Sequence, residues 1–182
     1  MNVSEAVAAV DGFDPGADQL AAKSRELTLD LLRYSTAPFS RSQFAPGHVT
    51  CTALVLLLSP GGEPRVLFMH HHRLHRWLLP GGHVEESDAS LAEAAAREAV
   101  EETWVRIDPT RAPSLAGIDV HGIPPKKGEP FHLHHDLIWC FRALTEDIQT
   151  TDEAPSVLWA GSADWDRLNV AESIRNSILR SA

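Results

Sequence analysis

Three glutamates stand close together in the segment REAVEETWV, at positions Glu98, Glu101 and Glu102. On an α-helix, spacings of three and four residues make side chains neighbours, so these carboxylates would share one sector of the surface. Like charges at this spacing each cost about 0.2–0.5 kcal/mol, and a divalent cation would offset that cost. Magnesium prefers oxygen ligands and keeps several waters, which leaves room for substrate phosphates. The cluster therefore indicates a magnesium site, with a solvated charged face as the alternative.

The segment in front of the glutamates, LPGGHVEE, contains the pair Gly81 and Gly82. Glycine lets the backbone approach a ligand closely or adopt a positive φ. Residues 88–103 have strongly helix-forming composition, and Asp88 is the expected N-cap. The alanine-rich side of this helix should face the core, next to the glutamates. Strand, glycine turn and carboxylate helix together predict the wall of a pocket.

The same segment resembles a known sequence motif. GGHVEESDASLAEAAAREAVEETWV is similar to the Nudix box, whose pattern is G-x5-E-x7-R-E-U-x-E-E-x-G-U, with U a bulky aliphatic residue. The flanking strands also resemble a Nudix core from about residue 48 to residue 160. The matching positions are Gly82, Arg97, Glu98, Glu101, Glu102 and Val105.

Three positions depart from the pattern. Asp88 stands at the first acidic position, and eight residues rather than seven separate it from Arg97. Ala99 replaces the bulky aliphatic residue, and Trp104 stands where the pattern has glycine. A glycine there would supply the left-handed residue that ends many helices. We therefore expect the helix to end in another way or to run on briefly, with the Trp104 ring buried against the N-terminal segment or the following loop.

The resemblance implies an enzyme that hydrolyses a phosphoanhydride in a nucleoside diphosphate linked to another moiety X. In such hydrolases the box glutamates hold magnesium or manganese, which neutralises phosphate oxygens and lowers the pKa of a bound water. The sequence carries no marker that identifies X, so a nucleotide sugar and a nucleoside triphosphate both remain open. The resemblance assigns catalysis to Glu98, Glu101, Glu102 and Arg97, with Arg97 orienting the glutamates, and assigns the metal to the three glutamates and Gly82.

Other acidic residues are candidates for the general base, which in this family often lies outside the box. Glu85 is an additional ligand or base candidate. Glu129, in the loop PPKKGEP, is the first choice for a base on a mobile loop, and Glu153 is the second. Ordinary solvated loop residues are the alternative for both.

A basic segment precedes the glycine turn. HHHRLHR, residues 70–76, is followed by Trp77, and its arginines Arg73 and Arg76 could receive substrate phosphates. Trp77 is the best candidate to stack on a nucleobase, although a tryptophan in a core of this size usually serves packing. Gly81 could present its backbone to the substrate. A transition-metal site, for which histidine is the usual ligand, and a polar strand end are the alternatives for the whole segment.

Histidine and aspartate alternate in two further segments. HLHHD places His132, His134 and Asp136 on one face of a strand, and GIDVH places Asp119 and His121 likewise. If the two strands are neighbours, these residues could form one polar wall of a substrate pocket. A zinc site through the H-x-H pair would require a third ligand, and a hydrated sheet face is the other alternative.

The elements that would position these residues follow from periodicity and turn signals. Residues 20–34 predict an amphipathic helix with Leu20, Leu27 and Leu31 on its apolar face, after a loose or weakly helical arm. Residues 48–72 predict a hairpin, and three later strands and a C-terminal helix over 171–181 follow. The predicted fold is α+β, a Nudix-like α/β/α sandwich with a mixed sheet, divided into an N-terminal helical extension (1–47) and a catalytic domain (48–182).

Composition limits the partners. The chain has 182 residues and a formal net charge of −9, which disfavours nucleic acid and anionic membranes as partners. Cys51 and Cys140 lie in apolar runs and indicate a reducing compartment, so we expect a cytoplasmic location. The expected partner is a small phosphorylated substrate, and a homodimer is left open.

Two rival functions remain at this point. A Nudix-fold isopentenyl-diphosphate isomerase would require a catalytic cysteine beside the pocket, whereas both cysteines are expected in the core. A Nudix-like binding module without turnover would be indicated by loss of the box carboxylates, and the three central glutamates are present.

Overall fold

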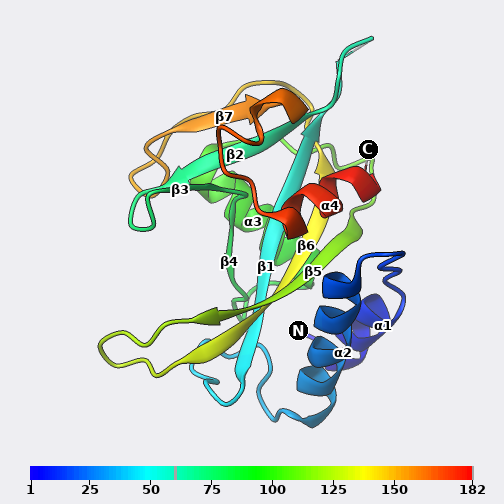
Figure 1. Ribbon diagram of the computed structural model, residues 1–182, viewed down its shortest axis with the longest axis vertical. Helices are drawn as coiled ribbons and strands as arrows, with labels where there is room; N and C mark the ends of the chain where they lie inside the picture. The colour runs from blue at the N-terminus through cyan, green and yellow to red at the C-terminus, as the bar shows by residue number, and fades with distance from the viewer. Residues whose placement is uncertain (60, 182) are drawn as a thin grey trace.

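The structure is a computed structural model that describes residues 1–59 and 61–181, and its centre is a mixed sheet of seven strands (Figure 1). The strand order is β3-β2-β1-β6-β5, with β4 also paired to β1 and β7 to β2. The elements are α1 (Val3–Asp11), α2 (Gln19–Tyr34), β1 (Gly47–Leu57), β2 (Arg65–His71), β3 (Arg76–Leu78), β4 (Gly81–His83), α3 (Leu91–Thr103), β5 (Ser114–Ile123), β6 (His132–Arg142), β7 (Val157–Ala160), a 3-10 helix (Ser162–Asp164) and α4 (Glu172–Ser181).

Strand β1 organises the sheet because it pairs on both sides. It runs parallel to β6 from Gly47 to Leu56 and antiparallel to β2 and β4. The predicted hairpin over residues 48–72 is therefore confirmed, with Leu56 opposite Val66. The parallel pairing joins strands that lie far apart in sequence, and no local pattern specifies it.

Helices cover the two faces of the sheet, because alternate residues of β1 point to opposite sides. Val49, Cys51, Ala53 and Val55 pack with the alanine face of α3 and with α1 and α2. Leu54 and Leu56 pack with Ile178 of α4 on the other face. In Figure 1, α3 lies behind the sheet and α4 in front of it. The predicted α/β/α sandwich with a mixed sheet and N-terminal helices is confirmed.

The N-terminal segment is more regular than predicted. The expected loose arm contains helix α1, capped by the side chain of Asn2. Helix α2 forms where expected, but Leu20 and Leu27 of its predicted apolar face are exposed. It turns Ser24 and Thr28 toward the sheet, where Ser24 accepts from the Val120 amide and the Thr28 hydroxyl lies 3.1 Å from Nδ1 of His135. The buried face of α2 combines these two polar residues with Ala21, Leu29, Leu31 and Leu32. The division at residues 47/48 stays a prediction.

Helix α3 begins and ends differently from the prediction. Ser90 is its N-cap, accepting a hydrogen bond from the Glu93 amide, so the assignment of Asp88 as the cap is wrong. At the other end Trp104 itself adopts the left-handed conformation, with φ 57° and ψ 18°. Its side chain is exposed, so the expectation of a buried ring is also wrong. Among residues 1–59 and 61–181, no helix has both the length and the apolar character to cross a bilayer.

Candidate active site

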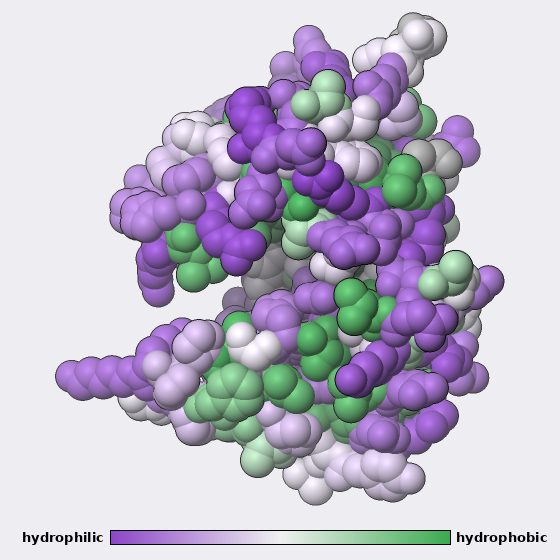
Figure 2. Space-filling view, viewed as in Figure 1, coloured by the Kyte–Doolittle hydropathy of each residue, from purple (hydrophilic) through white to green (hydrophobic). Residues whose placement is uncertain are grey.

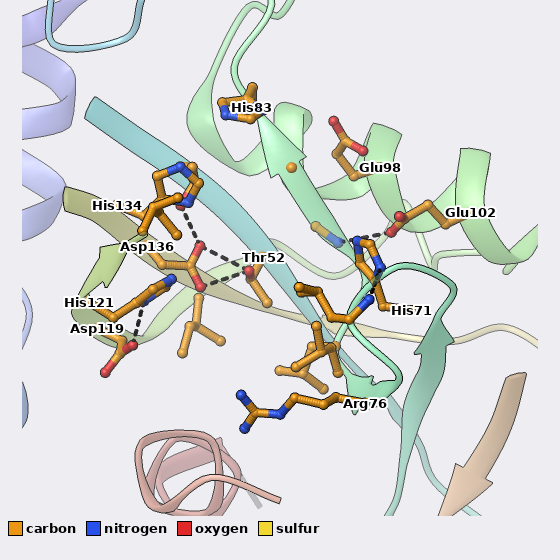
Figure 3. A pocket seen from close by; sticks show the side chains of 18 of the residues that line it. Thr52, His71, Arg76, His83, Glu98, Glu102, Asp119, His121, His134 and Asp136 are labelled. Carbon is orange, nitrogen blue, oxygen red and sulfur yellow. Dashed lines mark hydrogen bonds and ion pairs between the residues drawn. The ribbon is translucent and has the colours of Figure 1, made fainter. Parts of the chain in front are cut away.

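A cavity of about 930 Å³ opens between α3 with its glycine turn and the polar part of the sheet. Figure 2 shows the molecule hollowed between the β5–β6 end and the β2–β3 turn. Figure 3 shows Glu98 and Glu102 on one side of this space and His134, Asp136 and His121 on the other. The cavity is large enough for a nucleotide-sized ligand.

Strand β4 brings the glycine turn directly against the helix. A Cβ atom on Gly82 would lie 2.5 Å from Oε1 of Glu98, so the carboxylate occupies the space that any side chain would need. A Cβ atom on Gly81 would lie 2.7 Å from the carbonyl oxygen of Cys51. Both glycines are therefore required by close approach, and Gly82 lets Glu98 reach the cavity.

Glu102 is the most deeply buried of the three glutamates. Its Oε2 accepts a hydrogen bond of 3.0 Å from the Gly81 amide. Burial raises the pKa of Glu102 to about 8, and the Glu98 carboxylate adds to this rise despite the Gly81 bond. Burial likewise raises the pKa of Glu98. Two half-desolvated carboxylates on the same cavity wall require a cation for both to be ionised at neutral pH.

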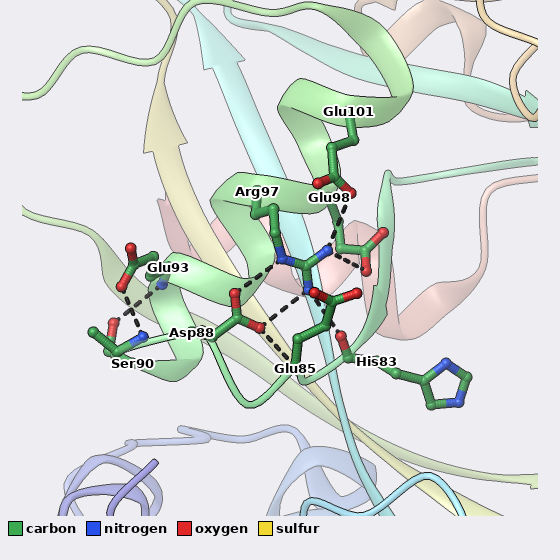
Figure 4. A network of polar contacts seen from close by, with 9 residues as sticks. His83, Glu85, Asp88, Ser90, Glu93, Arg97, Glu98 and Glu101 are labelled. Carbon is green, nitrogen blue, oxygen red and sulfur yellow. Dashed lines mark hydrogen bonds and ion pairs between the residues drawn. The ribbon is translucent and has the colours of Figure 1, made fainter.

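Arg97 holds the outer side of this group (Figure 4). Its guanidinium donates to Glu98 at 2.9 Å, to Glu101 at 3.1 Å and to the carbonyl oxygen of His83 at 3.0 Å. The side chain of Glu101 is 59% exposed and does not line the cavity. The three glutamates thus do not face the cavity equally, because Arg97 retains Glu101 at the rim.

Asp88 anchors Arg97 from the opposite side. Its two carboxylate oxygens accept from Nε and Nη2 of Arg97 at 2.9 and 3.1 Å, and Oδ2 also accepts from the Glu85 amide. The Arg97 hydrogen bond lowers the pKa of Asp88 below its ordinary value. Asp88, which departs from the box in residue type and in spacing, therefore holds Arg97 in place. Arg97 in turn holds Glu98 through its hydrogen bond.

The opposite wall is formed by polar residues of three neighbouring strands. Asp136 lies opposite Thr50 and Asp119 in the sheet, and its carboxylate accepts from the hydroxyls of Thr50 and Thr52 at 2.8–3.0 Å. His121 lies 2.9 Å from Asp119, and the pKa of His121 is raised by that carboxylate. The two His/Asp strands are neighbours in the sheet, and four of the five residues considered for this wall line the cavity, whereas His132 does not.

Arginine side chains also line the cavity. Arg73 and Arg76, predicted to bind phosphates, line it from the β2–β3 turn, together with Arg41 from the loop before β1. His134, Gly81 and Gly82 line it as well. Among the base candidates, Glu85 and Glu153 lie on the cavity wall.

Two predicted substrate contacts lie elsewhere. Trp77 is half-buried against the apolar cluster under α4 and meets the ring of His70 edge-on at 5.3 Å. Glu129 forms an ion pair of 3.0 Å with Lys126 in the β5–β6 loop. Neither lines the cavity, because the turns that carry them direct these side chains to other neighbours.

Some lining residues were not predicted. Thr50 and Thr52 hold Asp136, and Arg41 and Asp152 complete parts of the wall. The strand HVTCT carries the same alternation of polar residues as HLHHD, and this pattern could have identified the two threonines. Arg41 and Asp152 lie in loops with no distinguishing pattern.

The fold and site define a class of protein: a sandwich in which a glycine turn and a carboxylate helix form one side of a cavity. A family model for the NUDIX domain matches residues 49–176, more than half of the chain. The chain therefore belongs to the Nudix family, and the prediction of a Nudix-type pyrophosphohydrolase is confirmed at the level of the family. Comparison with curated proteins gave no match.

Solved structures show the same fold at low sequence identity. The NUDIX domain of Shewanella oneidensis NrtR complexed with ADP ribose has a TM-score of 0.57 at 19% identity, covering 84% of this chain and 97% of its own. A Listeria monocytogenes protein named as a NUDIX hydrolase has a TM-score of 0.55 at 16% identity, covering 73% and 90%. A Caenorhabditis elegans Ap4A hydrolase complex has a TM-score of 0.50 at 16% identity, covering 73% and 93%.

Proposed function

We propose that the protein hydrolyses a phosphoanhydride bond in a nucleoside diphosphate linked to another moiety, with magnesium held at the glutamate wall. The observation that carries this proposal is the pair Glu98 and Glu102, which share one wall of a cavity large enough for a nucleotide. Glu101 is exposed, does not line the cavity and pairs with Arg97, so we assign it a rim role in ion pairing.

The residues fit a hard divalent cation. Carboxylate oxygens are the ligands that magnesium and manganese take, and burial raises the pKa of Glu102 to about 8 in the absence of a cation. When bound, such an ion neutralises phosphate oxygens and lowers the pKa of a coordinated water. Glu98 and Glu102 would hold it, with Gly82 close enough to contribute a backbone group.

The chain's own residues then bind and orient the substrate. Arg73, Arg76 and Arg41 lie in the same cavity and supply positive charge for the terminal phosphates. Arg97 keeps Glu98 in place through its hydrogen bond of 2.9 Å. Of the acidic residues considered as the base, Glu85 and Glu153 lie on the cavity wall, and we propose that one of these two accepts a proton from water.

The position of the cysteines argues against the isomerase, whereas the binding module stays an alternative. Isomerase chemistry requires a reactive cysteine in the cavity, yet Cys51 and Cys140 are buried and neither lines it. Burial raises the pKa of both thiols, which disfavours the reactive thiolate. A binding module shares this site in every respect except turnover, so only an assay separates it.

The test is a panel of nucleotide sugars, dinucleoside polyphosphates, ADP-ribose and nucleoside triphosphates, assayed for product release with and without magnesium. We expect at least one compound to be cleaved only with the metal. Glu102→Gln should abolish that cleavage, whereas Glu86→Gln, an exposed glutamate outside the cavity, should retain it. Equal activity of Glu102→Gln and the parent would refute the proposed role, and tight binding without cleavage across the panel would favour a binding module.

A further inference from the structure

Three histidines converge at the polar end of the sheet, apart from the glutamate wall. His48 of β1 lies directly opposite His134 of β6 in the parallel register, and His132 lies two residues before His134 on the same face. One ring nitrogen of each lies within 4.8 Å of those of the other two. Among the described residues, this is the one group of three histidine, cysteine or acidic side chains that lies close enough to share a metal ion.

The hydrogen bonds of two of these rings determine which nitrogen is free. Nδ1 of His48 lies 3.1 Å from the Gln43 carbonyl oxygen, and Nδ1 of His132 lies 2.8 Å from that of Pro130. A carbonyl oxygen can only accept, so each Nδ1 carries the proton, and in the neutral imidazole each Nε2 then carries a lone pair. A backbone carbonyl that orients a ligating histidine in this way is the usual outer partner in metal sites.

The free nitrogen of His48 has no protein partner. The side chain is 1% exposed, and its Nε2 has no hydrogen-bond partner among the described residues. A buried acceptor left without a partner is unfavourable, and buried polar groups are rarely left so. The rings of His132 and His134 stand 5.2 and 4.8 Å from that of His48, so several imidazoles face one small space.

We propose that His48, His132 and His134 bind a transition-metal ion of the zinc class, at a second site distinct from the magnesium site at Glu98 and Glu102. Imidazole suits zinc, whereas magnesium prefers oxygen. Three histidines leave a fourth tetrahedral position, which water or a substrate oxygen occupies in open zinc sites. His134 lines the cavity, so this position borders the space where the substrate would lie. The inference stands independently of the proposed hydrolysis.

The experiment is zinc binding by the untagged, metal-stripped full chain, measured in competition with a chromophoric chelator. We expect one zinc ion per chain, and binding at least about 10-fold weaker in His134→Gln, since even the outer partners of metal ligands cost about 10–100-fold. His72→Gln, an exposed histidine outside the cluster, should bind as the parent does. The double variant E98Q/E102Q should still bind zinc but should lose the proposed magnesium-dependent hydrolysis.

Two further measurements complete the test. Zinc should raise the Tm of the parent but not of His134→Gln, whose fold is checked by circular dichroism. X-ray absorption of the zinc-loaded parent, which needs no variant, should show imidazole nitrogens as the main ligands. The proposal is overturned if the parent binds no zinc, if the ligand shell is oxygen only, or if zinc is lost in E98Q/E102Q and retained in His134→Gln.

Discussion

The amide of Gly81 donates a hydrogen bond of 3.0 Å to Oε2 of Glu102, and this bond joins the glycine turn to the carboxylate helix. It is the one hydrogen bond that the Glu102 carboxylate receives among the described residues, and burial still raises the pKa of Glu102 to about 8. The Glu102 carboxylate is thus held on the cavity wall, where a cation would bind it. Its burial as an ionised group destabilises the fold when no metal is bound.

Glu102→Gln should lose activity and gain stability. We expect metal-dependent hydrolysis to fall more than about 100-fold, since even indirect partners of metal ligands cost about 10–100-fold. In chelator, the same change should raise the free energy of unfolding by a few kcal/mol, because one pKa unit corresponds to about 1.4 kcal/mol. Thermal unfolding with magnesium and in chelator measures the stability of the metal-bound and the metal-free protein. A variant less stable than the parent in chelator would contradict the prediction.

The stability gain of Glu102→Gln should depend on pH with a definite sign. The folded-state pKa of Glu102 is about 8, above its ordinary value of 4.5, so ionisation destabilises the metal-free fold. The gain should be absent below about pH 4, grow between the two pKa values and level off above about pH 8. Unfolding curves of parent and variant in chelator from pH 4 to 9 measure it, and a gain constant across this range would contradict the assigned pKa.

Gly82→Ala should lower the hydrolytic activity with little effect on stability. The added Cβ would meet the Glu98 carboxylate at 2.5 Å, and this flexible side chain can move away. We expect hydrolysis to drop at least about 10-fold because Glu98 leaves the cavity wall, as expected for a displaced metal ligand. The Tm should change by only a few degrees. Gly161→Ala, whose Cβ would make an ordinary contact of 3.4 Å, is the control, and equal activity of both variants would contradict the prediction.

Asp88→Asn should weaken both the fold and the site. It removes the charge that accepts two hydrogen bonds from Arg97, and breaking a buried ion pair costs about 3–5 kcal/mol. Because the pKa of Asp88 is lowered in the fold, its contribution is present above the ordinary pKa and is lost as pH falls through the folded value. Denaturant unfolding of the parent and Asp88→Asn at pH 7 and pH 3 should show a large difference that shrinks at the lower pH.

Trp104→Gly should stabilise the protein. Trp104 is exposed and holds φ 57°, a conformation that costs a residue with a side chain about 1–2 kcal/mol. Glycine removes that strain but gains unfolded-state entropy, so we expect a net gain of about 0.5–1 kcal/mol. Trp104→Ala keeps the strained backbone and removes the ring, so it should show no such gain. If Trp104→Gly and Trp104→Ala were equally stable, the change in stability would come from loss of the indole ring and not from relief of backbone strain.

Local sequence patterns predicted the parts of this protein that depend on neighbours along the chain. Helix α3 formed because its composition favours helix, and Glu98 and Glu102 share a wall because they are four residues apart. The failures arose where a distant group competes. Asp88 does not cap α3: Ser90 takes that position, and both carboxylate oxygens of Asp88 bind Arg97, nine residues later.

The sequence by itself determined the family, the sandwich and the helix that carries the carboxylates, because hydrophobic period, glycine spacing and charge spacing are local properties. Only the tertiary structure decided that Glu101 stays with Arg97 and that Thr50 and Thr52 hold Asp136. It also decided that His48 joins the H-x-H pair of β6. The physical reason is the parallel pairing of β1 with β6, which brings together residues 86 positions apart through contacts that no local pattern encodes.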